Sequence, residues 1–422
     1  MNKIKAIFLS YRGLPKEIYI LFLARIINSI GSFVSPLLSL ILTQKIGLSK
    51  TEAGVYITVL MASQAPSLLL GGKLADSFGR KKIILIFQGL GASSLILCGF
   101  LPPSITMILI LCISANFYMM SFPAMDALVA DVTTPENRKS SYSLLYMGHN
   151  LGFAIGPVIG GMLYKRFLPM IFIGDALTTL LSVFLVMLFI KETVHKKIPS
   201  PAEPPLETQD ADLEKHETGS VLQVLFKRPV LLYFAFIMFI YQFAYSQWGF
   251  TLPLQLGDLL GEEGAGLYGL VAGFNGVMVI AFTPVLNAAT HKISPMKAIT
   301  FGGVLYALAF GMLGFIKAPY LFFASAFIMT LGEIMISISN GTFIANHTPA
   351  SHRGRVNSVL PLIIGAGYSV GPMVTGKIMA FHSIRTTWLM VSASVFTGAV
   401  LMKILEHKET QSKTTAASVV RD

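Results

Sequence analysis

Glu333 is the residue of this sequence with the clearest potential for proton chemistry, because it is the one charged residue in a long apolar run. It lies fourteen residues after Pro319 and thirteen before Asn346. Apolar surroundings favour the neutral form of a carboxyl group, so such a group can take up and release a proton near neutral pH. We interpret Glu333 as a proton-coupling residue. The alternative is a structural glutamate that is hydrogen-bonded to neighbouring helices.

Two opposite charges, Arg25 and Asp126, lie at similar depth in two other apolar runs. Arg25 stands nine residues beyond Lys16, and Asp126 precedes Asp131 by five residues, which places Asp126 roughly 7–8 Å inside its run. We predict that Arg25 and Asp126 form a partly desolvated pair beside a cavity and separate during a working cycle. The alternative for Arg25 is that its side chain extends to the nearer interface.

Polar and aromatic residues give two further runs a face that predicts a cavity lining for an amphipathic or planar organic molecule. The candidate lining residues are Tyr241, Gln242, Tyr245 and Asn275. The sequence contains no Walker loop, metal-ligand cluster or nucleophile constellation. We therefore expect no enzyme activity, no metal and no cofactor other than a proton as coupling ion.

Apolar runs long enough to cross a membrane must position these residues. Of 422 residues, 54% are hydrophobic and 13% are charged, about half the charged share of globular proteins, and the mean hydropathy is +0.68. A bilayer core needs about 20 apolar residues per helix. Twelve such runs are centred near residues 30, 62, 92, 117, 153, 179, 243, 277, 307, 332, 369 and 395. This pattern predicts an all-α polytopic membrane protein.

The distribution of charge predicts the orientation of these helices. The net charge is +11, and basic residues gather before the first run and after the even-numbered runs. These residues include Lys3, Lys5, Arg12, Lys16, Arg80, Lys81, Lys82, Arg138, Lys139, Lys292, Lys297, Arg353 and Arg355. An opposite loop is acidic (Asp258, Glu262, Glu263). Positive loops face the cytoplasm, so we predict both termini there and no nucleic-acid partner.

The sequence divides into two similar halves around a polar segment. Residues 199–205 hold four prolines, and residues 203–217 hold six acids against one lysine, a composition that cannot bury a core. We predict a six-helix bundle at 1–191, a cytoplasmic linker at 192–228 ending in a short amphipathic helix, a second bundle at 229–407 and a disordered cytoplasmic tail at 408–422.

A glycine–proline block is repeated between the halves. Gly152, Gly156, Pro157 and Gly161 recur 215 positions later as Gly367, Gly371, Pro372 and Gly376. The repetition predicts two pseudo-symmetric bundles.

The loop after the second run reads Gly-Lys-Leu-Ala-Asp-Ser-Phe-Gly-Arg-Lys-Lys from Gly72 to Lys82. It resembles motif A of the major facilitator superfamily, G-x-L-x-D-x-x-G-R-[RK]-[RK]. The resemblance implies a turn at Gly79 and a charge cluster that holds the outward-facing form. The candidate gate residues are Gly72, Asp76, Gly79, Arg80, Asp131 and Arg138. The alternative is a set of solvated loop charges, each worth little.

The first copy of the glycine block resembles motif C of the same superfamily, G-x-x-x-G-P-x-x-G-G, which is associated with drug–proton antiporters. Its residues are Gly152, Gly156, Pro157, Gly160 and Gly161. Small residues at this spacing also permit close helix packing, and a packing role alone is the alternative to an antiporter motif. The segment Thr330-Leu-Gly-Glu333-Ile is similar to that of the LmrP- and MdtH-like multidrug transporters, which implies a coupling role for Glu333.

These resemblances imply a twelve-helix transporter of the plasma membrane that works by alternating access around a midplane site. The expected activity is efflux of a small organic compound in exchange for protons, by a monomer in contact with membrane lipids. Uptake by proton symport or uniport is the alternative within transport, and a non-transporting sensor or scaffold is the remote one. The residues Ala115–Met120 lack the motif B arginine, so neutral, zwitterionic or anionic substrates stay open, and Arg25 would suit an anion.

Overall fold

Long α-helices make up nearly all of the computed structural model, which describes residues 11–193, 228–290, 293–348 and 353–419. Eleven helical segments of this described part are long and apolar enough to cross a membrane. A twelfth long helix, α7 (Pro135–Tyr164), is less apolar because it contains several glycines together with His149 and Asn150. Together the twelve segments coincide with the twelve runs, so the predicted all-α membrane architecture is confirmed.

The helices form two compact units, of which the first comprises Met1–Ser200 with Leu252–Ile280 and the second comprises Pro201–Thr251 with Ala281–Asp422. The first unit contains α2 (Lys16–Ile30), α3 (Val34–Leu40), a π-helical turn (Ile41–Lys45), α4 (Lys50–Phe78), α5 (Arg80–Phe100), α6 (Ile105–Val132), α7, α8 (Leu168–Phe189) and most of α11 (Thr251–Leu260) and α12 (Glu263–Thr290). The second contains α10 (Pro229–Gly249), α13 (Pro295–Leu313), α14 (Pro319–His347), α15 (Arg353–Phe381) and α16 (Ile384–Val419).

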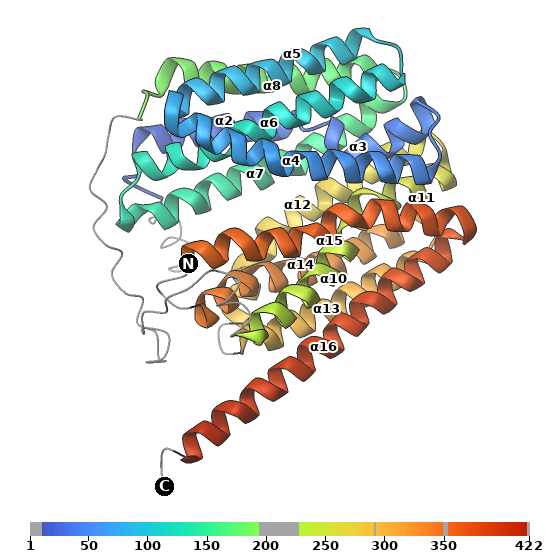
Figure 1. Cartoon of the computed structure of the whole chain (residues 1–422). Coiled ribbons are helices and arrows are strands. Elements are labelled where there is room, and N and C mark those ends of the chain that lie inside the picture. Colours follow the sequence, from blue (N-terminus) through green and yellow to red (C-terminus); the bar gives the residue numbers. More distant parts are fainter. Residues whose placement is uncertain (1–10, 194–227, 291–292, 349–352, 420–422) are drawn as a thin grey trace. The chain divides into compact units, whose positions relative to one another are not determined.

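A stripe of glycines on α7 sets the packing of the first unit, in which α2 lies against α7 and α8, and α5 against α6 and α8 (Figure 1). The stripe consists of Gly148, Gly152, Gly156 and Gly160. A Cβ atom at Gly152 would lie 2.7 Å from the carbonyl oxygen of Ile26, and one at Gly156 would lie 2.8 Å from that of Ser29. Only glycine permits this approach of two helix backbones.

The second unit repeats this arrangement with the second copy of the glycine block. Helix α15 packs on α10, and α13 packs on α14 and α16. A Cβ at Gly367 would lie 2.1 Å from the carbonyl oxygen of Phe239, and one at Gly371 would lie 1.9 Å from the hydroxyl of Ser246. The repeated sequence block therefore makes equivalent helix contacts in the two units.

The boundary of the units differs from the predicted boundary at 229, because α11 and the first part of α12 belong to the first unit. Lys45 pairs with Glu262 at 2.5 Å, and Lys50 with Asp258 at 2.5 Å. A third pair joins Lys165 to Glu263. The acidic loop is thus held by lysines of the first half, an association between distant segments that no local pattern displays.

The predicted disordered tail at 408–422 is wrong for most of its length, because α16 stays helical to Val419. No glycine or proline follows Gly398, so nothing in the sequence ends the helix. Side chains bond one turn apart, as Gln411 does with His407 at 2.9 Å, and such pairs support a helix. The central linker lies outside the described residues from 194 to 227, as does its expected amphipathic helix.

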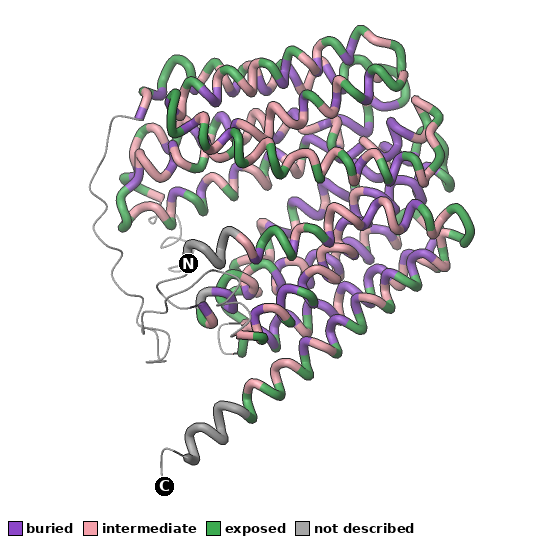
Figure 2. The backbone as a smooth tube through the Cα atoms, in the orientation of Figure 1, coloured by how far each residue is buried: buried purple, intermediate pink, exposed green. Residues whose placement is uncertain are grey.

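Large apolar side chains are exposed on the outer helices, a pattern that suits contact with lipid. Phe100 is 76% exposed and Leu69 is 69% exposed. Figure 2 shows exposed positions along the length of α5 and α4, rather than at their ends alone. A soluble protein rarely exposes apolar area on this scale, whereas a hydrocarbon core accommodates it.

Candidate functional site

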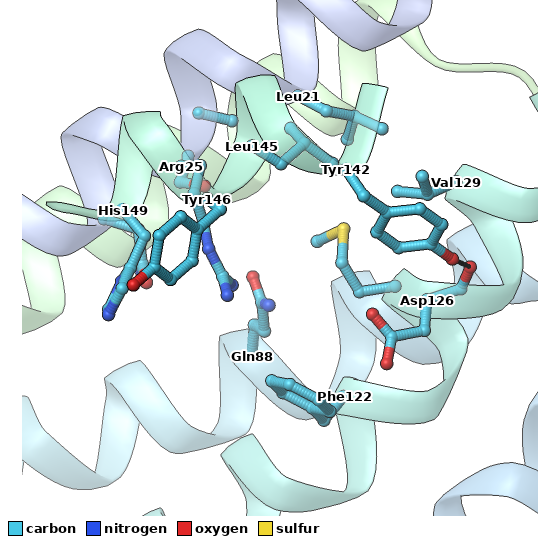
Figure 3. A pocket seen from close by; sticks show the side chains of 14 residues that line it. Leu21, Arg25, Gln88, Phe122, Asp126, Val129, Tyr142, Leu145, Tyr146 and His149 are labelled. Atoms are coloured by element: carbon cyan, nitrogen blue, oxygen red, sulfur yellow. Dashed lines mark hydrogen bonds between the residues drawn. The ribbon is translucent and has the colours of Figure 1, made fainter. Parts of the chain in front are cut away.

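A cavity of about 180 Å³ lies among α2, α5, α6, α7 and α8 of the first unit (Figure 3). Both members of the predicted charge pair, Arg25 and Asp126, line it. The polar lining residues are Arg25, Asn28, Gln88, Asp126, Tyr142, Tyr146, His149 and Ser182. Helices distant in sequence therefore bring a cation, an acid and an imidazole to one cavity.

Arg25 and Asp126 share the cavity without direct contact. Their charges attract each other, but neither side chain forms a hydrogen bond or ion pair with any residue in the described part of the chain. The Tyr142 hydroxyl donates a hydrogen bond of 3.2 Å to the backbone oxygen of Asp126 and not to its carboxylate. Direct pairing of the two charges stays a prediction for another conformation.

His149 is a cavity residue that sequence reasoning missed. Its Nδ1 lies 3.0 Å from Oγ of Ser29, a contact that joins α7 to α2. It stands in the window 143–164, which holds no Asp, Glu, Lys or Arg. A titratable ring inside a span without formal charges is the signal that could have identified it.

Glu333 lies at the centre of α14, fourteen residues from Pro319 and fourteen from His347. The hydroxyl of Tyr245, on α10, donates a hydrogen bond of 2.8 Å to Oε1 of Glu333. The Tyr245 ring stacks on that of Tyr306, with centroids 6.1 Å apart. The Glu333 carboxyl is therefore half-buried and held by an aromatic residue of another helix.

The other predicted lining residues lie on α10 and α12, and two of them are buried. Tyr241 is 1% exposed and packs against Gly303 and Gly398 in the interior of the second unit. Asn275 is 5% exposed on α12, and Gln242 is half-buried on α10. Glycines on two neighbouring helices make room for the Tyr241 ring, and a role of Tyr241 in a cavity lining stays a prediction.

The structure brings three residues of the motif A prediction together. Arg80 pairs with Asp76 at 3.0 Å and with Asp131 at 3.3 Å. Thr193, just beyond α8, donates a hydrogen bond of 2.7 Å to the same carboxylate of Asp131. One guanidinium therefore joins the ends of α4, α5 and α6, and a hydroxyl adds the end of α8.

Glu192 is a second residue that sequence reasoning missed, and it explains Gly79. The Glu192 carboxylate accepts hydrogen bonds from the backbone amides of Lys81 at 3.3 Å and Lys82 at 3.2 Å. It therefore caps the positive N-terminus of α5. Gly79 has φ +112°, and a Cβ there would lie 2.4 Å from Oε2 of Glu192, so the position is closed to larger residues.

The contacts of Arg138 and Gly72 differ from those that the motif A prediction implies. Arg138 donates to the carbonyl oxygen of Ala130 and to Oγ1 of Thr133, so it satisfies the free carbonyls at the end of α6. The close approach of α4 to α6 occurs at Gly71, where a Cβ would lie 2.1 Å from the backbone oxygen of Met120. At Gly72 the nearest atom is 3.8 Å away.

Replacing Glu192 by glutamine should lower the free energy of unfolding at neutral pH by only about 0.3–1 kcal/mol, because the side chain is only partly buried and solvent screens its charge. Partial burial raises the pKa of Glu192, but hydrogen bonds from the backbone amides of Thr193 and of the start of α5 outweigh this and hold the pKa below its ordinary value. The contribution is therefore present above about pH 4.3 and is lost as the pH falls through the lowered pKa.

Thermal unfolding of the purified protein between pH 7 and pH 4 measures this difference. The exposed neighbour Lys191 supplies the control variant Lys191→Gln, which should leave unfolding unchanged. Equal unfolding of Glu192→Gln and wild type at pH 7 would contradict the capping role.

Gly79→Ala should lower the free energy of unfolding by about 1–3 kcal/mol, because alanine is strained at this φ and meets the Glu192 carboxylate. Gly89 on the same α5 is the matched control, since a Cβ there meets nothing within 4 Å. Gly89→Ala should be neutral or stabilising by up to about 1 kcal/mol. Chemical unfolding of both variants in detergent checks the contrast, and equal losses would show that the turn geometry is unimportant.

The match to known proteins agrees with this geometry. The profile described as Major Facilitator Superfamily matches residues 21–319 and 264–420. The chain is 24% identical to the multidrug resistance protein MdtG of Dickeya zeae (strain Ech586), covering 87% of this chain and 88% of that protein. It is 22% identical to a Na(+), Li(+), K(+)/H(+) antiporter of Planococcus maritimus, covering 87% and 91%.

Among solved structures, the nucleoside transporter NupG superposes with a TM-score of 0.73 at 14% identity, covering 93% of this chain and 99% of that one. The fold and the matches define a membrane transporter and not an enzyme. The chain belongs to the major facilitator superfamily, and it is a multi-pass protein of the bacterial inner membrane that moves a small molecule.

Proposed function

We propose that this transporter exports a small organic compound in exchange for protons, with Glu333 as the proton-coupling residue. The carrying observation is the position of Glu333 at the centre of α14, where Tyr245 donates a hydrogen bond to its carboxylate. The carboxyl group can hold a proton in one conformation and release it in another. A relative named as a cation/H(+) antiporter and one named as a multidrug resistance protein support exchange and export.

The contact between Tyr245 and Glu333 supplies a way to link protonation to helix position. An ionised carboxylate only accepts hydrogen bonds, whereas a protonated one also donates. The Tyr245 hydroxyl on α10 therefore faces a pure acceptor when Glu333 is ionised and a group that can also donate when Glu333 is protonated. Protonation thus changes the relative energy of the two conformations.

The Asp76–Arg80–Asp131 cluster acts as the lock of the outward-facing form, on the cytoplasmic side. It joins the ends of three helices through one guanidinium. The transporter works as a monomer surrounded by lipid, which its exposed apolar side chains suit.

Purified wild-type protein in liposomes, with a pH dye inside and tetracycline or ethidium as probe, tests the proposal. Adding the probe to one side should drive protons toward that side as the probe crosses. Movement of protons and probe in the same direction would favour the alternative, proton-coupled uptake. Probe movement without proton movement would favour a uniporter.

A further inference from the structure

We infer that the cavity of the first unit is a binding site for a small zwitterion, whose anionic group binds Arg25 and whose ammonium group binds Asp126 and Gln88. Figure 3 shows these three side chains directed into the cavity. The inference rests on the proposed function and names the substrate class that the transporter accepts.

Opposite charges without protein partners are the first reason. Arg25 on α2 is half-buried and Asp126 on α6 is exposed to the cavity, and neither side chain has a hydrogen bond or ion pair in the described chain. Unpaired charges inside a membrane protein are costly. A ligand that carries both charges satisfies both residues. An anion alone would face the Asp126 carboxylate, and a cation alone would face the Arg25 guanidinium.

An unsatisfied acceptor is the second, independent reason. The Oε1 atom of Gln88 is buried and has no hydrogen-bond partner, while its Nε2 donates to Oγ of Ser121 at 3.3 Å. Buried polar atoms without partners are rare and call for a ligand or water. An ammonium group has three donors, so it can bind the Asp126 carboxylate and the Gln88 oxygen together.

The size of the cavity limits the ligand. The volume of about 180 Å³ suits a chain of a few carbons between the two charges. Phe122, Met125 and Leu145 supply apolar surface for such a chain. The cavity therefore suits a compact molecule with a charge at each end.

Binding of matched probes to the purified full-length protein tests the inference. The zwitterions are 3-aminopropanoate, 4-aminobutanoate and 6-aminohexanoate, and each is compared with the alkanoate and the alkylamine of equal length. At least one zwitterion should bind about tenfold more tightly than both of its singly charged counterparts, because each of these leaves one protein charge unpaired. Equilibrium dialysis with labelled probe measures the affinities.

Arg25→Gln and Asp126→Asn should each remove this preference, whereas Arg25→Lys should keep part of it. Arg12 is exposed and lies outside the cavity, so Arg12→Gln should leave the affinities unchanged. Equal affinity of wild type for a zwitterion and its singly charged counterparts would overturn the inference, and so would a preference that survives both variants. The wild-type comparison holds even where a variant fails to fold.

Liposome experiments separate this inference from the proposed function. Proton exchange with tetracycline or ethidium, in a protein that does not prefer zwitterions, would overturn the zwitterion site alone. Binding and movement of a zwitterion without proton movement would overturn proton exchange alone.

Discussion

Glu333→Gln is expected to reduce substrate-driven proton movement to the rate of empty liposomes. Glutamine keeps the size of the side chain and an oxygen that can accept the hydrogen bond from Tyr245, which is 2.8 Å long in the wild type. It cannot bind and release a proton near neutral pH, so the coupling step is removed while the packing is preserved. Proton flux and probe flux are measured together in liposomes at several pH values.

Two variants make the Glu333 result specific. Tyr245→Phe removes the donated hydrogen bond and should slow exchange while proton movement persists, because the carboxyl group is still present. Glu17→Gln, in the first turn of α2, makes the same chemical change outside the central site and should behave as wild type. Proton flux in Glu333→Gln with an unchanged pH dependence would assign coupling to another group.

Gly269→Ala is expected to slow transport about tenfold or more, because the added methyl group disfavours the close packing of α12 on α7. The cost of about 1–3 kcal/mol lowers the population of the closely packed conformation by a factor of about 5–150. A Cβ at Gly269 would lie 2.2 Å from the carbonyl oxygen of Pro157. A backbone oxygen cannot move aside as the end of a long side chain can. An added methyl group therefore forces α12 and α7 apart or strains their backbones.

Gly266 is the matched control on the same helix. The nearest atom to a Cβ at Gly266 is the backbone oxygen of Gly161, 4.0 Å away, which is an ordinary contact. Both substitutions raise helix propensity equally, so a difference in transport rate between Gly269→Ala and Gly266→Ala reports the packing alone. Equal rates for the two variants would show that the α7–α12 contact does not limit the cycle.

The fold could be predicted from the sequence to a large extent because membrane helices follow local rules. Each span must be apolar over about 20 residues, and the repeated Gly–Pro block marks the duplication directly. The tail was the exception, since polar composition was read as disorder although helix formers without glycine or proline continue α16 to Val419. The division into units also escaped prediction, because it depends on contacts between segments far apart in sequence, among them the ion pair of Lys45 with Glu262.

The candidate sites could be predicted only in part. Glu333, Arg25 and Asp126 were identifiable because a charge inside an apolar run is rare and costly. Glu192 was not, since one acid after a helix looks like any loop charge until the start of α5 is placed beside it. The enclosure of the Tyr241 ring could not be predicted either, because it depends on two glycines of other helices.

The sequence by itself determined which segments cross the membrane and where charges stand inside them, because both depend on single residues or short windows and on the cost of placing charge in hydrocarbon. Tertiary structure alone decided which of those residues meet. Arg25, Gln88 and Asp126 reach one cavity from three helices, while Arg25 and Asp126 stay unpaired. Such contacts depend on helix packing between segments far apart in sequence, where one glycine sets how closely two backbones approach.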